Sequence, residues 1–215
     1  MHDTRRLAAD NEVEMGTRAG TWIGLWTLLT ALLLAGQVDA VELRSYRVER
    51  YTATQGLSTE SLLHAAPLAD GRILLVGTRG EPLLFDGYRF APPPYPRSEA
   101  AAFDGGYAAL EAPNGDLWVS SMRRGLTRIR GGSVLRVPLP EGMRPVQIRL
   151  SPDGSRLLVT SQQGLHALSL AADPPVLQPL ASGRALLTAL EDADGRSWAA
   201  GVGGLFRVVE GVLQP

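Results

Sequence analysis

The chain has 215 residues, a formal net charge of −1, 45% hydrophobic and 20% charged residues, and no cysteine. This composition is typical of a soluble globular protein and excludes disordered and fibrous classes. The near-zero charge lacks the basic surface that binding to a nucleic-acid backbone needs, so we expect no nucleic-acid partner. The absence of cysteine excludes disulfides, thiolate zinc sites and thiol catalysis.

The N-terminal region contains a candidate export signal. Residues 1–20 form an extension, and Thr21 to Ala35 is an apolar run without charge, followed by the small residues Val38 and Ala40. Residues 21–40 are therefore predicted to be a signal peptide cleaved after Ala40, which would leave Val41 as the mature N-terminus. The alternative is an uncleaved inner-membrane anchor. Both alternatives predict a periplasmic location for the rest of the chain.

Residues 41–215 contain a repeat. A turn glycine recurs about every 40 residues, another glycine follows each one nine or ten positions later, and an apolar residue stands three positions after each turn glycine. Four short strands per unit with this spacing predict an all-β fold of four-stranded antiparallel β-propeller blades. The turn glycines are Gly71, Gly115, Gly154 and Gly195, the apolar residues are Leu74, Trp118, Leu157 and Trp198, and the blades lie near 52–96, 103–140, 144–180 and 184–215.

Within each blade the strands have different patterns. The second strands are almost continuously apolar, which predicts burial on both faces and places Trp118 and Trp198 between blades. The third strands alternate, most clearly in the run that contains Leu126 and Arg128. Prolines, Pro179 among them, are expected at the ends of the outer strands. The predicted inner strands are 61–66, 107–112, 146–150 and 186–191.

Four blades could close as a small ring, but we favour part of a seven-bladed ring, which needs about 280 residues. The chain is then expected to be the N-terminal part of a longer protein. The strand predicted at 46–51 would complete the last blade of the ring. In that case the free faces of blades one and four would expose Leu74, Leu75, Trp198 and Phe206, and the isolated chain would self-associate.

Several segments resemble one known repeat. These are Asp70 to Gly80, Phe85-Asp86-Gly87, Asn114 to Val119, Gly125 to Arg128 and the opening Gln55-Gly56-Leu57-Ser58. They resemble the two-component regulator propeller repeat over about residues 51–215, most weakly in the third blade. The resemblance implies a periplasmic sensor region of a membrane-bound histidine kinase or diguanylate cyclase. It also implies that catalytic output domains, further blades and dimer formation belong to a full-length form, so this chain is not expected to be an enzyme.

Candidate chemical groups are sparse. His64 and His166 lack metal-ligand spacing, no Gly-x-Ser-x-Gly elbow occurs, and no cofactor or metal is expected. The acidic residues Asp70, Asp153 and Asp194 repeat once per blade, which favours turn formation over catalysis. An enzyme such as a lyase or a glycan-processing hydrolase remains the alternative function, but it would need His, Tyr, Arg or paired carboxylates gathered at the central channel.

The loops between second and third strands carry long polar side chains. Propeller topology places these loops on one face with the connections between blades. Fork-shaped donors there could bind an unknown small molecule or oligosaccharide, particularly an anionic one. The predicted ligand-binding residues are Arg79, Arg123, Arg124, Gln162 and Gln163. The alternative is that these residues are solvated and bind nothing.

Overall fold

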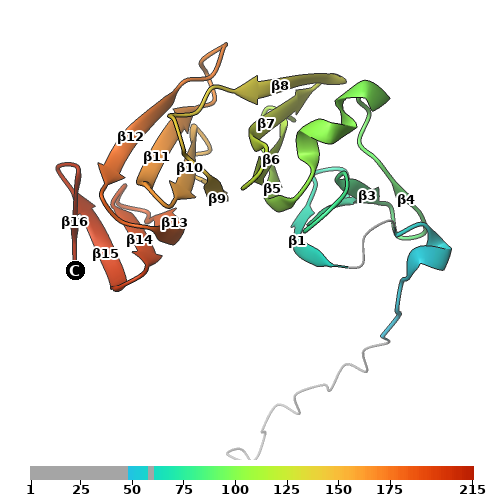
Figure 1. Ribbon diagram of the computed structural model, residues 1–215, viewed down its shortest axis with the longest axis horizontal. Helices are drawn as coiled ribbons and strands as arrows, with labels where there is room; N and C mark the ends of the chain where they lie inside the picture. Colours follow the sequence, from blue (N-terminus) through green and yellow to red (C-terminus); the bar gives the residue numbers. More distant parts are fainter. Residues whose placement is uncertain (1–47, 58–60) are drawn as a thin grey trace, which may run out of the picture. The chain divides into compact units, whose positions relative to one another are not determined.

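In the computed structural model, which describes residues 48–57 and 61–215, consecutive strands pair antiparallel in four sheets of four strands (Figure 1). The strands of each sheet follow one another in chain order. The predicted all-β fold of four-stranded propeller blades is therefore confirmed. We number these sheets blades one to four.

The bounds of the elements are as follows. Blade one consists of β1 (Leu62–Pro67), β2 (Ile73–Gly77), β3 (Leu83–Phe85) and β4 (Phe90–Ala91). Blade two consists of β5 (Gly106–Glu111), β6 (Leu117–Ser121), β7 (Gly125–Arg130) and β8 (Ser133–Val137). Blade three consists of β9 (Pro145–Leu150), β10 (Arg156–Ser161), β11 (Gly164–Ser169) and β12 (Leu177–Ser182). Blade four consists of β13 (Leu186–Glu191), β14 (Ser197–Gly201), β15 (Gly204–Val209) and β16 (Val212–Gln214). Two short 3₁₀ helices are η1 (Ala53–Gln55) and η2 (Arg97–Phe103).

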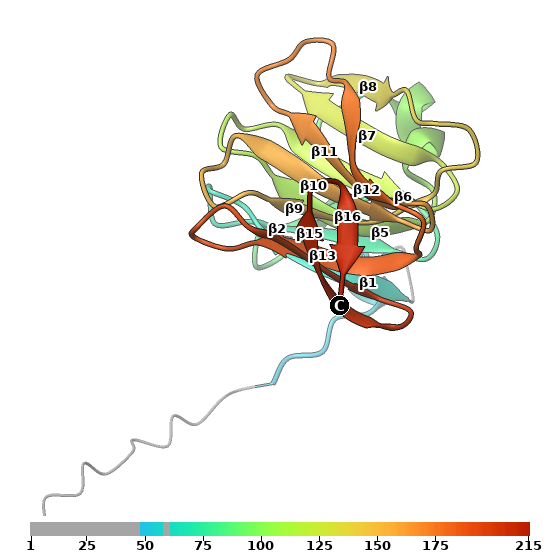
Figure 2. The ribbon, with the colours of Figure 1, turned by 90° about the vertical axis from the view of Figure 1, so that its left-hand side faces the viewer.

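The blades pack face to face in chain order (Figures 1 and 2). Their first strands contact one another, β1 with β5, β5 with β9, and β9 with β13. Three apolar clusters fill the spaces between successive blades, and each draws residues from two sheets. Trp118 of blade two, for example, packs with Ile148 and Val159 of blade three. The repeat therefore has a physical basis, because each sheet buries its faces against its neighbours.

The turn between the first two strands recurs with one exception. In blades one, two and four it is closed by a backbone hydrogen bond between residues four apart, as from Asp192 N to Arg196 O at 2.9 Å. In blade three Ser151 N bonds to Arg156 O, one residue further along the chain. The prediction that Leu157 occupies the position of Trp118 is therefore wrong. Leu158 occupies it, since Leu158 pairs with Arg149 as Trp118 pairs with Leu110.

The turn aspartates act as predicted in two blades. Asp70 Oδ1 accepts the backbone N–H of Arg72 at 3.0 Å, and Asp153 Oδ1 accepts that of Ser155 at 3.0 Å. In blade four, Asp192 accepts the backbone N–H groups of Asp194 and Arg196 instead. Asp194 forms an exposed ion pair with Arg196. The prediction that Asp194 forms this turn is therefore wrong, because Asp192, two residues earlier, has that role.

The structure corrects three predictions about the strands. Trp118 is buried between blades as predicted, whereas Trp198 is only partly buried. The third strand β7 does not alternate in exposure, because Arg128 is also buried, with its Nη2 3.1 Å from Oδ1 of Asp173. Pro179 lies inside the outer strand β12 rather than at its end. It sits beside a bulge in an edge strand, where a missing N–H donor is tolerated.

The prediction of which apolar residues are exposed on the free faces is largely wrong. Leu74, Leu75 and Phe206 are buried, whereas Leu187, Leu190 and Leu205 of blade four are exposed. Of the strand predicted at 46–51, residues 46 and 47 lie outside the described part of the chain, and residues 48–51 form no strand. Instead, the Tyr51 ring packs edge-on against Phe85, with centroids 4.8 Å apart.

The predicted signal segment, residues 21–40, lies outside the described residues. Within the described residues no helix has the length and apolar character that crossing a membrane requires.

Candidate functional site

The face with the β2–β3, β6–β7 and β10–β11 loops carries all five residues predicted to bind ligand. In an antiparallel meander these loops lie at the same end of the sheets as the connections between blades. The ends of the second strands shape the loops. Ser121 Oγ donates to Asp104 O at 2.9 Å and accepts the backbone N–H groups of Arg123 and Arg124 at 3.2 and 3.0 Å. Ser161 holds Gln163 N in the same way at 3.1 Å.

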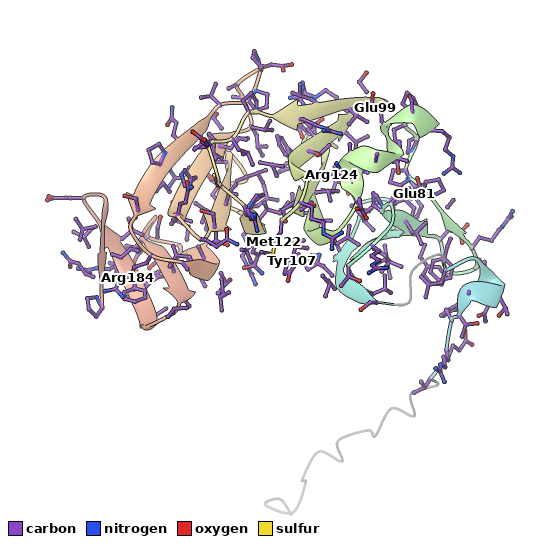
Figure 3. All side chains as sticks on the ribbon, in the orientation of Figure 1. Glu81, Glu99, Tyr107, Met122, Arg124 and Arg184 are labelled. Atoms are coloured by element: carbon purple, nitrogen blue, oxygen red, sulfur yellow. The ribbon has the colours of Figure 1, made fainter. Side chains whose placement is uncertain are left out.

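Arg123 contributes to a pocket of about 570 Å³ on this face, which we call the Tyr107 pocket. Arg123 Nη1 lies 3.8 Å from Oδ2 of Asp104, and both side chains remain partly exposed. Tyr107 and Met122 lie beside each other in Figure 3. The pocket therefore combines an aromatic ring, a thioether and two guanidinium groups. Its lining residues are Thr78, Gly105, Tyr107, Met122, Arg123 and Arg144.

Arg124 contributes to a different hollow of about 450 Å³, together with Gly80, Glu81 and Asp104. Glu81 is already paired, because its carboxylate accepts from Tyr95 Oη at 2.7 Å and Arg97 Nη1 at 2.6 Å. Burial and the Glu81 hydrogen bond raise the pKa of Tyr95. Arg123 and Arg124 thus line separate hollows, so the five predicted ligand-binding residues do not form one site.

The other three predicted residues line neither hollow. Arg79, Gln162 and Gln163 are exposed in their loops. The side chain of Gln163 donates from Nε2 to Glu141 O at 2.9 Å, which ties its loop to the connection between blades two and three. A ligand-binding role for these three residues stays a prediction.

Of the residues that line the Tyr107 pocket, sequence reasoning predicted only Arg123 as a site residue, and it missed Tyr107 and Arg144 among the others. Tyr107 is the second residue of the inner strand β5, where it is followed by two alanines, and it is 42% exposed. A large aromatic residue in a strand position that favours small side chains was a usable signal. Arg144 lies in a connecting segment and gave no such signal, because only packing brings it to Arg123.

A second polar region lies along the inner strands β1, β5 and β9. It is a groove of about 380 Å³ whose polar residues are His64, Glu111, Gln147 and Arg149. Burial and the nearby Arg149 lower the pKa of His64, whose Nδ1 accepts the Ala109 N–H at 3.3 Å. Glu111 Oε2 accepts the Ala69 N–H at 2.6 Å. The groove therefore gathers groups that looked scattered in the sequence, but the backbone already occupies two of them.

No cluster of three or more His, Asp or Glu side chains that could hold a metal ion occurs among the described residues.

No protein-family model and no curated protein matches this chain. Among solved structures, the extracellular domain of the hybrid two-component system BT3049 from B. thetaiotaomicron matches with a TM-score of 0.65 at 20% identity, over 79% of this chain and 26% of the other. The corresponding domain of BT4673 from the same organism matches with a TM-score of 0.59 at 12% identity, over 70% and 21% of the two chains.

An enzyme matches as well. The gluconolactonase XC5397 from Xanthomonas campestris has a TM-score of 0.56 at 14% identity, over 71% of this chain and 60% of the other. This chain spans about a quarter or less of the two chains from two-component systems. At these identities the likeness concerns the fold, which sensors and enzymes share. The chain is thus built from β-propeller blades like those in extracellular domains of two-component systems.

Proposed function

We propose that this chain is a ligand-binding module of an extracytoplasmic sensor protein, and that it binds a small anionic or sugar-like molecule in the Tyr107 pocket. The observation that supports this most directly is the meeting of Tyr107, Arg123 and Arg144 from separate segments around one hollow. Its volume of about 570 Å³ falls within the range of small-molecule sites, roughly 300–1,000 Å³.

The chemistry of the lining suggests the class of ligand. Arginine guanidinium groups bind carboxylate, sulfate or phosphate through paired N–H donors. The partly exposed ring of Tyr107 offers an apolar face and a hydroxyl group, and Met122 offers an adaptable apolar contact. A sugar acid satisfies both requirements, since its ring can lie on the tyrosine while its carboxylate meets the arginines.

Calorimetric titration with glucuronate, with glucose and with inorganic phosphate tests this proposal. Glucuronate is expected to bind more tightly than glucose, and Arg123→Ala and Arg144→Ala should each weaken its binding by about tenfold or more, the loss of a charge-assisted hydrogen bond. Arg136→Ala is the matched control, because Arg136 is exposed on the outer strand of the same blade and outside the pocket. Equal effects of the three substitutions, or no binding of any probe, would count against the pocket.

The proposal places the module outside the cytoplasm, which the extracellular domains of similar fold support. N-terminal sequencing of the protein from a periplasmic fraction should find Val41 first. Recovery of the intact hydrophobic run in membranes alone would favour the tethered form instead.

An enzyme is the second candidate, supported by the fold match to a gluconolactonase and by His64 and Arg149 in the inner-strand groove. We assign it lower rank because the His64 Nδ1 and Glu111 Oε2 atoms already accept backbone N–H groups. Lactone hydrolysis by the purified chain that is lost in His64→Gln would reverse this ranking.

A further inference from the structure

Blade four buries one face and exposes the other. Its inward face packs on blade three through Leu186, Ala199 and Phe206, all at most 2% exposed. In Figure 2 the sheet β13–β16 lies in front of the other three, toward the viewer. Leu190 and Leu205 are exposed on this sheet by 49% and 61%. Exposed leucines within strands mark a surface that another structure can cover.

Strand register shows which residues of the other blades are equivalent to Leu205 and what covers them. Leu126 in blade two pairs with Ser120, Leu165 in blade three pairs with Thr160, and Leu205 in blade four pairs with Ala200. Each leucine follows the first glycine of its third strand, so the three are equivalent. Leu126 and Leu165 are fully buried, each in the cluster shared with the following blade. Leu205 therefore has the residue type and position of a contact with a following blade.

The second strands of the blades also show a residue on blade four that is placed to contact a following blade. Trp118 and its equivalent Leu158 are each 1% exposed, and both pack against the blade that follows. Their equivalent in blade four, Trp198, is only partly buried. Its Nε1 is held by Asp192 Oδ2 at 3.0 Å, so the indole stands in a fixed position on the open face.

Arg156 makes a polar contact with the next blade that the equivalent Arg196 of blade four does not make. The first-to-second-strand turns of blades one, three and four end in equivalent arginines, Arg72, Arg156 and Arg196. Arg156 binds Glu191, the last residue of the next inner strand, with Nη2 2.8 Å from Oε1. Glu111, at the same position in blade two, binds the turn of blade one at Ala69 N. Arg196 pairs within its own turn, with Nη1 3.0 Å from Asp194 Oδ2, as Arg72 does with Asp70 at 2.6 Å. Arg156 is therefore the arginine of this set that binds the next blade, and Arg196 has the position to do the same.

We infer that the open face of blade four is a docking surface for a further four-stranded blade of the same repeat, one that carries an acidic residue at the end of its inner strand. The incoming sheet covers Leu205 and Trp198, and its carboxylate binds Arg196. The first blade of a second copy does not fit, because Pro67 ends its inner strand and Leu75 and Leu83 are already buried. The observations thus favour a further blade over self-association.

The register of the outer strands makes a direct test feasible. Gln178 pairs with Ala167 and Gln214 with Arg207, which are equivalent positions, so Pro179 and Pro215 are equivalent as well. A second copy of residues 180–215 can therefore be joined directly after Pro215. Its first residues extend β16 in the way that residues after Pro179 extend β12, and the rest of the copy forms one additional blade. That blade supplies a second Glu191 opposite Arg196.

Because the chain has no cysteine, Leu205→Cys provides a single thiol on the open face. In the 215-residue chain this thiol should react rapidly with a maleimide, and in the extended chain it should react about tenfold or more slowly. Val202→Cys, in the exposed β14–β15 loop, is the control and should react equally in both. Glu→Gln at the added copy of position 191 should return part of the lost reactivity.

Each outcome decides the question. Equal reaction rates of Leu205→Cys in the two chains, or an added copy that stays unfolded by circular dichroism, would overturn the inference, since the face would have failed to receive the sheet that matches it. A 215-residue chain that dimerises in light scattering, with Leu205→Cys already protected, would show that a second copy covers the face and would overturn it as well. None of these results depends on a ligand in the Tyr107 pocket.

Discussion

Arg156 and Glu191 join blade three to blade four through three hydrogen bonds. Nη2 of Arg156 lies 2.8 Å from each carboxylate oxygen, and Nε lies 3.1 Å from Oε2. The Glu191 side chain is only 9% exposed, whereas that of Arg156 is 35% exposed. The pair thus links the two sheets at the edge of their apolar contact, and the arginine supplies the hydrogen bonds and the opposite charge that the buried carboxylate needs.

Removing this carboxylate should loosen the two blades. Glu191→Ala is expected to lower the free energy of unfolding by about 1–3 kcal/mol, because the arginine loses its partner but keeps access to water. Urea unfolding measures the effect. Arg196 is equivalent to Arg156 but pairs with exposed carboxylates, so Arg196→Ala should change the free energy of unfolding much less. Equal losses would show that the contact between blades contributes nothing beyond an exposed ion pair.

The two tryptophans should differ in their effect on stability. Trp118→Ala is expected to lower the free energy of unfolding by about 3–5 kcal/mol, since Trp118 is fully buried between blades two and three. Trp198→Ala should have a smaller effect, because water already reaches part of the indole. Thermal unfolding of both variants tests this order, and a larger loss for Trp198 would mean that its face is covered in solution.

Alanine substitutions of two glycines at equivalent positions should also differ in their effect on stability. Gly164 has φ +142°, and a Cβ there would overlap the carbonyl oxygen of Ala181 in the neighbouring strand. Gly204 has φ +122°, with no atom within 4 Å of such a Cβ. Gly164→Ala should therefore destabilise the protein by about 3 kcal/mol or more, and Gly204→Ala by about 1–2 kcal/mol from backbone strain alone. Chemical unfolding measures the free energy of unfolding of both variants, and equal losses would contradict this packing argument.

Acidification should lower stability in two steps. Burial lowers the pKa of His64 and His166, so the folded state favours their neutral forms. The stability that they contribute is complete above the unfolded pKa of about 6.5 and is lost as the pH falls through the lowered values. The pKa of Asp153 is lowered to about 2, mainly by the Ser151 hydroxyl, and that of Asp192 is lowered mainly by the Trp198 N–H. Their contribution is lost below about pH 4.

Urea unfolding between pH 8 and pH 3 measures both steps. The variant with both His64→Gln and His166→Gln should lack the first decline and keep the second. An unchanged first decline in this variant would assign it to other groups.

Local patterns in the sequence were enough to predict the blades. The turn glycines, the apolar second strands and the glycines that open the third strands act over a few residues. The inner strand β13 was predicted with its observed bounds and the other inner strands within a residue at either end. Such short-range signals depend on backbone conformation and strand alternation, which neighbouring residues determine.

The tertiary structure alone decided which equivalent residues are buried and which polar groups meet. Leu126 and Leu205 occupy the same position in the repeat, yet one is fully buried and the other is exposed, because burial depends on the next sheet. The extra residue in the turn of blade three moved the interface position from Leu157 to Leu158. Strand pairing within blade two brings Tyr107 to Arg123, and Arg144 joins them from the connection to blade three, so only the tertiary structure shows that the three residues line one pocket. A repeat pattern specifies each sheet, whereas contacts between sheets depend on packing across long sequence separations, which that pattern does not encode.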